Sequence, residues 1–177
     1  MKDVMFDLET FGKRPGCVVR SIGAVFFDMR GGLGHELYRN IEPDSCKAVG
    51  LGLDPDTVEW WSKQPQPARD ALLVDQQPLK RVVLEFANWF KAKGGERIWC
   101  QGATFDAPVW EAAALAVGSQ VPWKFWNVRD TRTLYDLYNF DPKSVARAGT
   151  YHNALDDAKH QARCVQAAVL HCSLQLL

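Results

Sequence analysis

The first apolar segment of the chain, residues 4–10, carries two carboxylates two positions apart, Asp7 and Glu9. Side chains two apart on a β-strand point to the same face, so an extended segment places both acids side by side. Two carboxylates on one face of a buried strand repel each other and lose their hydration. A hard divalent cation such as Mg²⁺, which prefers oxygen ligands, offsets that cost. The segment therefore predicts a buried strand that ends in a metal site.

The length and charge of the chain restrict its class. Its 177 residues are enough for one sizeable core, so we expect a single domain over residues 1–177. Lysine plus arginine and aspartate plus glutamate number 21 each. Zero net charge argues against a protein that binds nucleic acid mainly through a large positive field. It is compatible with a nuclease, because metal-binding acids would offset a local basic rim.

The cysteines and the apolar runs indicate the compartment. Five cysteines without a C-x-x-C pair argue against a zinc site or a disulfide framework and favour a reducing compartment. A strand pattern that begins at the third residue leaves no room for a signal peptide, and no run reaches the roughly eighteen apolar residues of a membrane span. We expect a cytoplasmic protein that does not enter a membrane.

The order of the predicted elements indicates a mixed α/β sheet. Strands are expected over residues 3–8, 18–27 and 36–41, joined by a Gly-rich turn at 28–34, as an antiparallel meander. Helices and strands then alternate. Helices are expected from residue 54 to a bend after 63, from 78 to the Gly94-Gly95 pair, over 106–117, through 134 and 137, and from about 153 onward, with strands at 97–101 and 127–130.

Two further segments carry acids in places where acids are costly. Asp106 ends the run Gly-Ala-Thr-Phe-Asp, just after a predicted strand and at a helix start. The run from His152 to Ala158, His-Asn-Ala-Leu-Asp-Asp-Ala, opens the last helix. Taken alone, Asp106 reads as a helix N-cap and His152 as a loop histidine. Three such segments in one chain instead indicate a shared site.

These three segments resemble the marks of the DEDDh branch of the DnaQ-like 3′→5′ exonucleases, the superfamily of proofreading domains, oligoribonuclease and RNase T. The marks are an acid-x-Glu on the first strand, an Asp after the central strand and H-x-A-x-x-D-A at the last helix, all present here in order. The Trp60-Trp61 pair and residues 130–134 further resemble small members labelled exonuclease-VIII-like. The resemblance implies an RNase H-like α/β fold with a mixed five-stranded sheet and helices on both faces.

The resemblance also implies a two-metal phosphodiester hydrolase that releases nucleoside 5′-monophosphates from a 3′ end. Its cofactor would be two Mg²⁺ ions, with Mn²⁺ able to substitute. Asp157, rather than Asp156, matches the ligand position of the family, and Asp156 would support the first turn of a helix capped by Asn153. His152 would be the general base for the attacking water. The implied ligands are Asp7, Glu9, Asp106 and Asp157.

The substrate contacts are expected around this site. By resemblance, Thr10 and Phe11 lie where the 3′-terminal nucleotide binds, although Phe11 would equally suit core packing. One indole of the Trp60-Trp61 pair is expected in the core and the other, for which Trp61 is taken, on a base or at a dimer contact. Arg129, Arg132 and Arg147, with Lys143 in the same stretch, form a candidate phosphate-contacting rim, against the plainer interpretation of a solvated face.

Several alternatives stay open at this point. The expected partner is a single-stranded 3′ end of either RNA or DNA, since contacts to the 2′-hydroxyl cannot be placed from one sequence. A hydrolase of dinucleotides or short oligonucleotides is a second interpretation, and zero net charge favours it mildly. A non-catalytic nucleic-acid-binding module of the same fold is a third. The exposed aromatic candidates also permit a homodimer.

Overall fold

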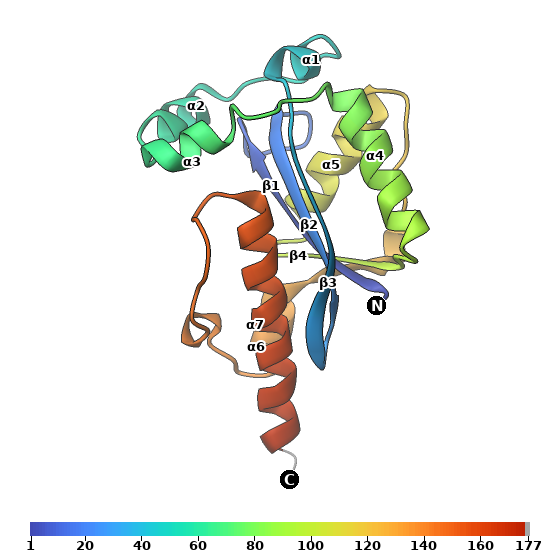
Figure 1. Ribbon diagram of the computed structural model, residues 1–177, viewed down its shortest axis with the longest axis vertical. Helices are drawn as coiled ribbons and strands as arrows, with labels where there is room; N and C mark the ends of the chain where they lie inside the picture. Colours follow the sequence, from blue (N-terminus) through green and yellow to red (C-terminus); the bar gives the residue numbers. More distant parts are fainter. Residues whose placement is uncertain (176–177) are drawn as a thin grey trace.

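A five-stranded mixed sheet forms the centre of the computed structural model, which describes residues 1–175 (Figure 1). The strand order is β3-β2-β1-β4-β5. β1 pairs antiparallel with β2 and β2 with β3, whereas β4 and β5 run parallel to β1. The predicted mixed sheet, with three antiparallel strands first, is confirmed. The strands are β1 (Asp3–Thr10), β2 (Val19–Asp28), β3 (Gly31–Asn40), β4 (Arg97–Cys100) and β5 (Val128–Asp130).

Helices cover both faces of this sheet, as Figure 1 shows. α7 packs along β1 and β2 on one face, and α4 and α5 lie over the other. None of the helices in the described range is long and apolar enough to cross a membrane. The helices are α1 (Pro43–Lys47), α2 (Pro55–Ser62), α3 (Gln66–Ala71), α4 (Leu79–Ala92), α5 (Asp106–Ala116), α6 (Thr131–Leu137) and α7 (Ala154–Gln175), with single 3₁₀ turns η1 (Phe125–Asn127) and η2 (Pro142–Ser144).

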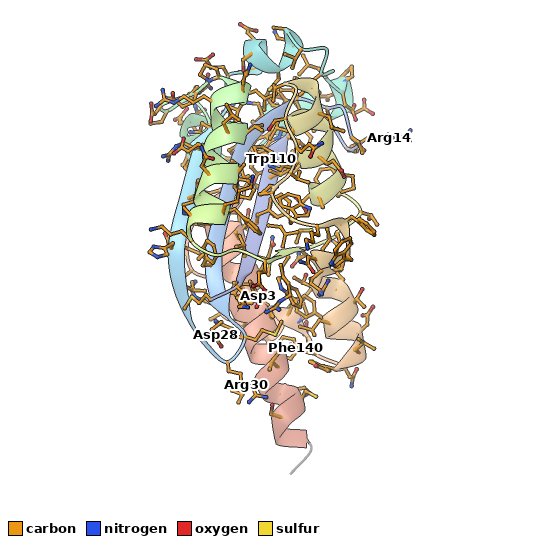
Figure 2. All side chains as sticks on the ribbon, turned by 90° about the vertical axis from the view of Figure 1, so that its right-hand side faces the viewer. Asp3, Arg14, Asp28, Arg30, Trp110 and Phe140 are labelled. Atoms are coloured by element: carbon orange, nitrogen blue, oxygen red, sulfur yellow. The ribbon has the colours of Figure 1, made fainter. Side chains whose placement is uncertain are left out.

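Strand alternation separates two cores. Val4, Phe6 and Leu8 of β1 point to the face covered by α4 and α5, whereas Met5 points to the face covered by α7. In Figure 2, Trp110 marks the first core and Phe140 packs against the second. Asp7 and Glu9 share the parity of Met5, so both carboxylates project on the α7 side.

The hairpin between β2 and β3 differs from the sequence expectation. The turn is confined to Met29 and Arg30, and the Gly-rich segment expected as turn is the start of β3. The β2–β3 pairing shifts register twice near the turn, where Phe27 pairs with Leu33 and Asp28 with Gly31. These shifts let the Gly-rich segment pair with β2 as a strand. The glycines therefore serve a bulged strand rather than a loop.

Gly23 brings the start of α7 close to the sheet. It lies opposite Asp7 in the β1–β2 register. A Cβ at this position would collide with the backbone of Ala154 and Leu155, in the first turn of α7. Only glycine permits this approach, which sets Asp157 over the carboxyl end of β1.

Gly23→Ala should therefore push the first turn of α7 off the sheet. We expect a loss of stability on the order of 1–3 kcal/mol, typical of overpacking, together with loss of function at the site. Thermal melting measures the first effect. Ala24, which is buried on the opposite face of the same strand, offers a matched control as Ala24→Gly. An unchanged melting temperature for Gly23→Ala would contradict the close approach.

Candidate metal centre and active site

Four carboxylates from three elements converge at the carboxyl end of β1. Asp7 and Glu9 come from the strand itself, and Asp157 from the first turn of α7. Asp106 is the first residue of α5, where it is almost fully buried and accepts a hydrogen bond of 3.3 Å from the backbone N–H of Leu8. The parallel pairing of β4 with β1 delivers α5 to this edge.

His152 joins the same cluster. One ligand atom each from Glu9, His152 and Asp157 lies within 4.8 Å of the other two, which is close enough for a shared cation. The backbone N–H of His152 donates to Asp157 Oδ2 at 3.1 Å. The structure thus brings together all five residues expected as catalytic or metal-binding, and their roles stay predictions.

Burial and mutual repulsion raise the pKa values of these carboxyls. Desolvation, followed by the charge of Asp106, raises the pKa of Glu9 to about 8. Desolvation likewise raises the pKa of Asp106 to about 7, against the hydrogen bond from Leu8. Desolvation and then the charges of Asp106 and Glu9 hold the pKa of Asp7 well above its usual range. The cluster is therefore short of positive charge.

Asp3, on the same face of β1, is a buried acid whose charge is fully paired. Its carboxylate accepts two hydrogen bonds of 2.6 Å from the Arg97 guanidinium and one of 2.8 Å from the Trp99 indole. Full pairing of this kind is the usual condition for a buried charge. The Asp7 carboxylate, four residues later, instead accepts a hydrogen bond from the uncharged side-chain amide of Gln161. Within residues 1–175, no ion pair like that of Asp3 is formed by Asp7, which distinguishes the carboxyl end of β1 from its beginning.

Arg147 supplies positive charge at the edge of this cluster. Its guanidinium forms an ion pair with Asp157 and stacks 4.0 Å from the centroid of the Tyr151 ring. Its charge lowers the pKa values of both Asp7 and Glu9, but less than burial raises them. A set of carboxylate oxygens that still lacks positive charge fits hard divalent cations such as Mg²⁺.

Aromatic rings hold the His152 imidazole in place. The Trp60 ring lies edge-on to it with 5.0 Å between centroids, and the Trp61 ring at 6.0 Å. His152 itself has a left-handed backbone with φ of 62°, a strained conformation for a residue with a side chain. Burial, and then the charge of Arg147, lowers the pKa of His152, which keeps the ring neutral near pH 7. A neutral imidazole can accept a proton.

The two adjacent acids of the last helix have different surroundings. Asp156 Oδ2 accepts the backbone N–H of Thr150 at 2.8 Å, and its side chain packs beneath Gly149, which has positive φ. Asn153 caps the helix as expected, since its Oδ1 accepts from the N–H groups of Leu155 and Asp156 at 3.2 Å. Asp156 thus supports the loop, and Asp157 faces the cluster.

The tryptophan pair is arranged in the opposite way to the expectation. Trp61 is 4% exposed and its indole N–H donates to the Thr10 carbonyl at 2.9 Å, so its ring is part of the wall of the site. Trp60 is the ring that remains 44% exposed beside His152. Trp60 therefore replaces Trp61 as the indole that a substrate can reach. On a helix, neighbouring residues face different environments, but the sequence does not say which one faces the core.

The other expected substrate contacts lie at different distances from the cluster. Thr10 is buried and donates to the Gly12 carbonyl at 2.7 Å. Phe11 packs against the core with the Arg20 guanidinium 5.0 Å from its ring centroid. Arg132 reaches back to Gly102, whereas Arg129 lies on β5, two strands from β1. Of the three arginines proposed as a rim, Arg147 alone forms an ion pair with a cluster carboxylate among residues 1–175.

Gln161 is a site residue that the sequence reasoning missed. It is 6% exposed, and its side-chain amide donates to Asp7 Oδ1 at 2.7 Å. Its own carbonyl oxygen is buried without a hydrogen-bond partner. The sequence does contain a pattern that points to Gln161. It is a polar residue within the apolar stripe of Ala158, Ala162 and Val165, one helical turn after Asp157. We regard Gln161 as a positioning residue for Asp7.

The comparisons with known proteins agree with this geometry. A family model described as the 3′-5′ exoribonuclease Rv2179c-like domain matches residues 2–169. An exodeoxyribonuclease of Enterobacteria phage T4 is 22% identical in an alignment of 163 residues that covers 75% of this chain and 70% of the phage protein.

Solved structures share the fold at low identity. E. coli exonuclease I in complex with a dT13 oligonucleotide superimposes with a TM-score of 0.69 at 15% identity, over 98% of this chain and 42% of that one. The nuclease domain of 3′hExo, described as a DEDDh family member bound to rAMP, gives a TM-score of 0.61 at 13% identity, over 95% and 91%. This chain spans less than half the length of exonuclease I. These likenesses confirm the predicted RNase H-like exonuclease fold.

Replacement of Gln161 should weaken the site without unfolding the protein. Gln161→Met keeps the size and burial of the side chain but leaves Asp7 without its amide, so we expect Mg²⁺ affinity to fall about 10- to 100-fold. Titration calorimetry, or the Mg²⁺ dependence of the melting temperature, measures this. Gln166→Met is the matched control, because the Gln166 amide donates to the carbonyls of the β2–β3 hairpin. Equal Mg²⁺ affinity in both variants would remove Gln161 from the site.

The raised carboxyl pKa values predict how stability depends on pH. An acid whose pKa is higher in the folded protein favours folding while protonated, so stability falls as pH rises through the interval between the unfolded and folded pKa values. For Glu9 that interval runs from 4.5 to about 8, and for Asp106 from 3.8 to about 7. Without metal, the melting temperature should therefore fall between about pH 5 and pH 8.

Mg²⁺ should reverse this trend, since a cation stabilises the ionised carboxylates. We expect the rise in melting temperature on adding Mg²⁺ to be larger near pH 8 than near pH 5. Glu9→Gln removes one titrating group and should flatten the metal-free slope, by at most about 1.4 kcal/mol per pH unit. A slope that Glu9→Gln leaves intact would show that the pH dependence arises elsewhere.

Proposed function

The chain belongs to the Rv2179c-like family of 3′-5′ exoribonuclease domains, and from this membership we propose that it is a divalent-metal-dependent exonuclease that shortens single-stranded nucleic acid from the 3′ end. The observation that carries the proposal is the convergence of Glu9, His152 and Asp157 within 4.8 Å of one another, beside the buried carboxyls of Asp7 and Asp106. Carboxylates that lack positive charge around a neutral imidazole suit hydrolysis of a phosphodiester.

The carboxylates would hold the metal. Asp7, Glu9, Asp106 and Asp157 are the oxygen ligands available for two Mg²⁺ ions, with Mn²⁺ as a substitute. When bound, two divalent cations neutralise the phosphate and stabilise the attacking and leaving oxygens of an in-line displacement. Gln161 holds Asp7, and the Leu8 N–H holds Asp106, so two of the carboxylates are oriented before any ligand arrives.

His152 would act as the general base. Its lowered pKa keeps the imidazole unprotonated, and its backbone N–H is tied to Asp157. The rings of Trp60 and Trp61 limit its rotation. The imidazole would take one proton from the attacking water as the water oxygen bonds to phosphorus. The bond between the phosphorus and the 3′ oxygen of the preceding nucleotide would break, and that oxygen would take a proton from solvent. The product is then a nucleoside 5′-monophosphate.

Arg147 would act on the substrate side. Its guanidinium is at the edge of the carboxylate cluster, where it is stacked on Tyr151 and also reaches the Thr150 carbonyl. An arginine held in this way can form two parallel hydrogen bonds to a phosphate. We therefore retain Arg147 as a phosphate contact, together with Arg132.

The proposal also covers the cellular compartment and the choice between RNA and DNA as substrate. All five cysteines are free thiols in the structure, in line with a reducing, cytoplasmic environment. The description of the family names an exoribonuclease, whereas the phage relative is named an exodeoxyribonuclease. RNA and DNA are therefore both to be tested as substrates. A non-catalytic binding module is the weaker alternative, because all four acids and the histidine are present.

The test is cleavage of 5′-labelled single-stranded RNA and DNA twenty-mers with Mg²⁺, Mn²⁺ or EDTA. We expect a metal-dependent ladder that shortens from the 3′ end. Asp7→Asn should abolish it, and His152→Ala should slow it on the order of 10²–10⁴-fold with metal binding kept. Asp44→Asn, at an exposed acid on α1, is the control that should cut normally.

Other outcomes separate the alternatives. Cleavage of dinucleotides but not of twenty-mers would favour the short-oligonucleotide hydrolase. Strand binding without cleavage under any metal would favour the non-catalytic module. Substantial activity in Asp7→Asn would contradict the proposed metal ligands.

A further inference from the structure

Two of the most exposed aromatic rings in the described chain are neighbours, and the site above does not use them. Phe125 is 83% exposed and Trp126 58%, on the single turn η1 just before β5. Their rings meet edge-to-face with 4.8 Å between centroids. Adjacent large apolar side chains left open to water indicate a surface that contacts something else.

A hollow runs beside these rings. A cavity of about 610 Å³ lies between α5 and the segment that leads into β5. We call it the aromatic groove. Its lining includes Ala103, Ala107, Leu115, Trp123, Phe125 and Trp126. Side chains of α5, from Ala107 to Leu115, form one wall and flat rings the other, which leaves a slot suited to planar groups.

The groove begins next to the carboxylate cluster. Ala107, in its wall, directly follows Asp106, whose carboxylate bonds to Leu8 of β1. Ala103 is at the carboxyl end of β4, where its N–H donates to Asp130 Oδ2 at 2.6 Å. The site and the groove therefore share the β4–α5 connection. A strand bound at both would follow this connection.

Positive side chains accompany the same path. Arg132 packs on Gly102, with Nη1 2.9 Å from where a Cβ there would lie. Arg129 Nη1 donates to the carbonyls of Trp126 and Val128 at 2.8 and 2.9 Å, so its charge is held behind the rings. Lys124 Nζ lies 5.3 Å from the Trp126 ring centroid. Lys124 and Glu111 line the groove itself, whereas Arg129 and Arg132 contact residues at or next to its wall.

We propose that the aromatic groove binds the unpaired nucleotides that lie 5′ of the cleaved residue, with bases stacked on Phe125 and Trp126 and phosphates near Lys124, Arg129 and Arg132. Aromatic faces interleaved with cations are typical of single-strand binding. This inference rests on the proposed exonuclease function and adds a preference for strands longer than a dinucleotide.

A second copy of the chain fits this surface less well. Protein interfaces are depleted in lysine at their centre, whereas here a lysine stacks on the exposed indole. The neighbouring edge strand, β5, is only three residues long and gives little backbone for strand addition. The exposed rings, with a lysine over one of them, favour a polyanion with flat bases.

The test measures binding without cleavage. In an Asp7→Asn background with Mg²⁺ present, fluorescence anisotropy gives the Kd of a 5′-labelled single-stranded twenty-mer and of a dinucleotide. Phe125→Ala combined with Trp126→Ala should raise the twenty-mer Kd roughly 10- to 100-fold and the dinucleotide Kd less than about 2-fold. Lys124→Gln should lower the salt slope of twenty-mer binding by about 1. Leu137→Ala, at an exposed leucine outside the groove, should change neither Kd.

Three results would overturn the groove assignment. One is a twenty-mer Kd unchanged in the double variant, and another is an equal loss in Leu137→Ala. The third is a wild-type dimer, seen by sedimentation, that the double variant dissolves while strand affinity is kept, since the surface is then a contact between copies. Melting curves check that the variants are folded.

The proposed function and the groove can fail separately. Dinucleotide cleavage without twenty-mer binding would keep the nuclease and exclude the groove. Twenty-mer binding that the double variant loses, in a protein that cleaves nothing, would keep the groove and exclude the nuclease.

Discussion

The crowding of carboxylates at the carboxyl end of β1 is the constraint around which the rest of this molecule is arranged. Asp7, Glu9 and Asp106 are held together in low dielectric without an equal number of cations, which raises their pKa values. Such a cluster persists only if the surrounding structure holds it. A parallel strand delivers α5, a glycine admits α7, and backbone and amide donors fix the oxygens.

The same crowding gives Arg147 two competing partners. Its guanidinium neutralises Asp157 in the metal-free protein, and Asp157 is one of the oxygens that a divalent cation would use. A metal held by Asp157, as proposed, would compete with this ion pair, and its net affinity would be the difference between the two interactions. An arginine released from Asp157 would keep its contact with the Tyr151 ring, beside the site proposed for the phosphate. In the proposed site, Arg147 would thus couple metal binding to substrate binding.

The sequence predicted the sheet from local patterns, and the family resemblance predicted which five residues lie together, while their roles stay predictions. Alternation in β1 placed Asp7 and Glu9 on one face, and the caps at Asp54 and Asn153 located two helix starts. The remainder depends on contacts distant in the chain. Whether Trp60 or Trp61 faces the core depends on where α2 docks, and Gln161 matters only because α7 lies over β1. The glycines at the start of β3 read as a turn because register shifts leave no mark in the sequence.

In the proposed arrangement, separate places for hydrolysis and for strand binding would let a chain with 21 positive and 21 negative side chains act on a polyanion. The acids needed for metal would repel a strand, so attraction must come from elsewhere and need not come from net charge. Phe125 and Trp126 offer faces that any unpaired base can stack on, and paired bases in a duplex offer none. A groove of this kind selects single strands by the accessibility of their bases, independently of sequence. Discrimination between ribose and deoxyribose is then left to the residues around the carboxylates, where the sugar of the last nucleotide must lie.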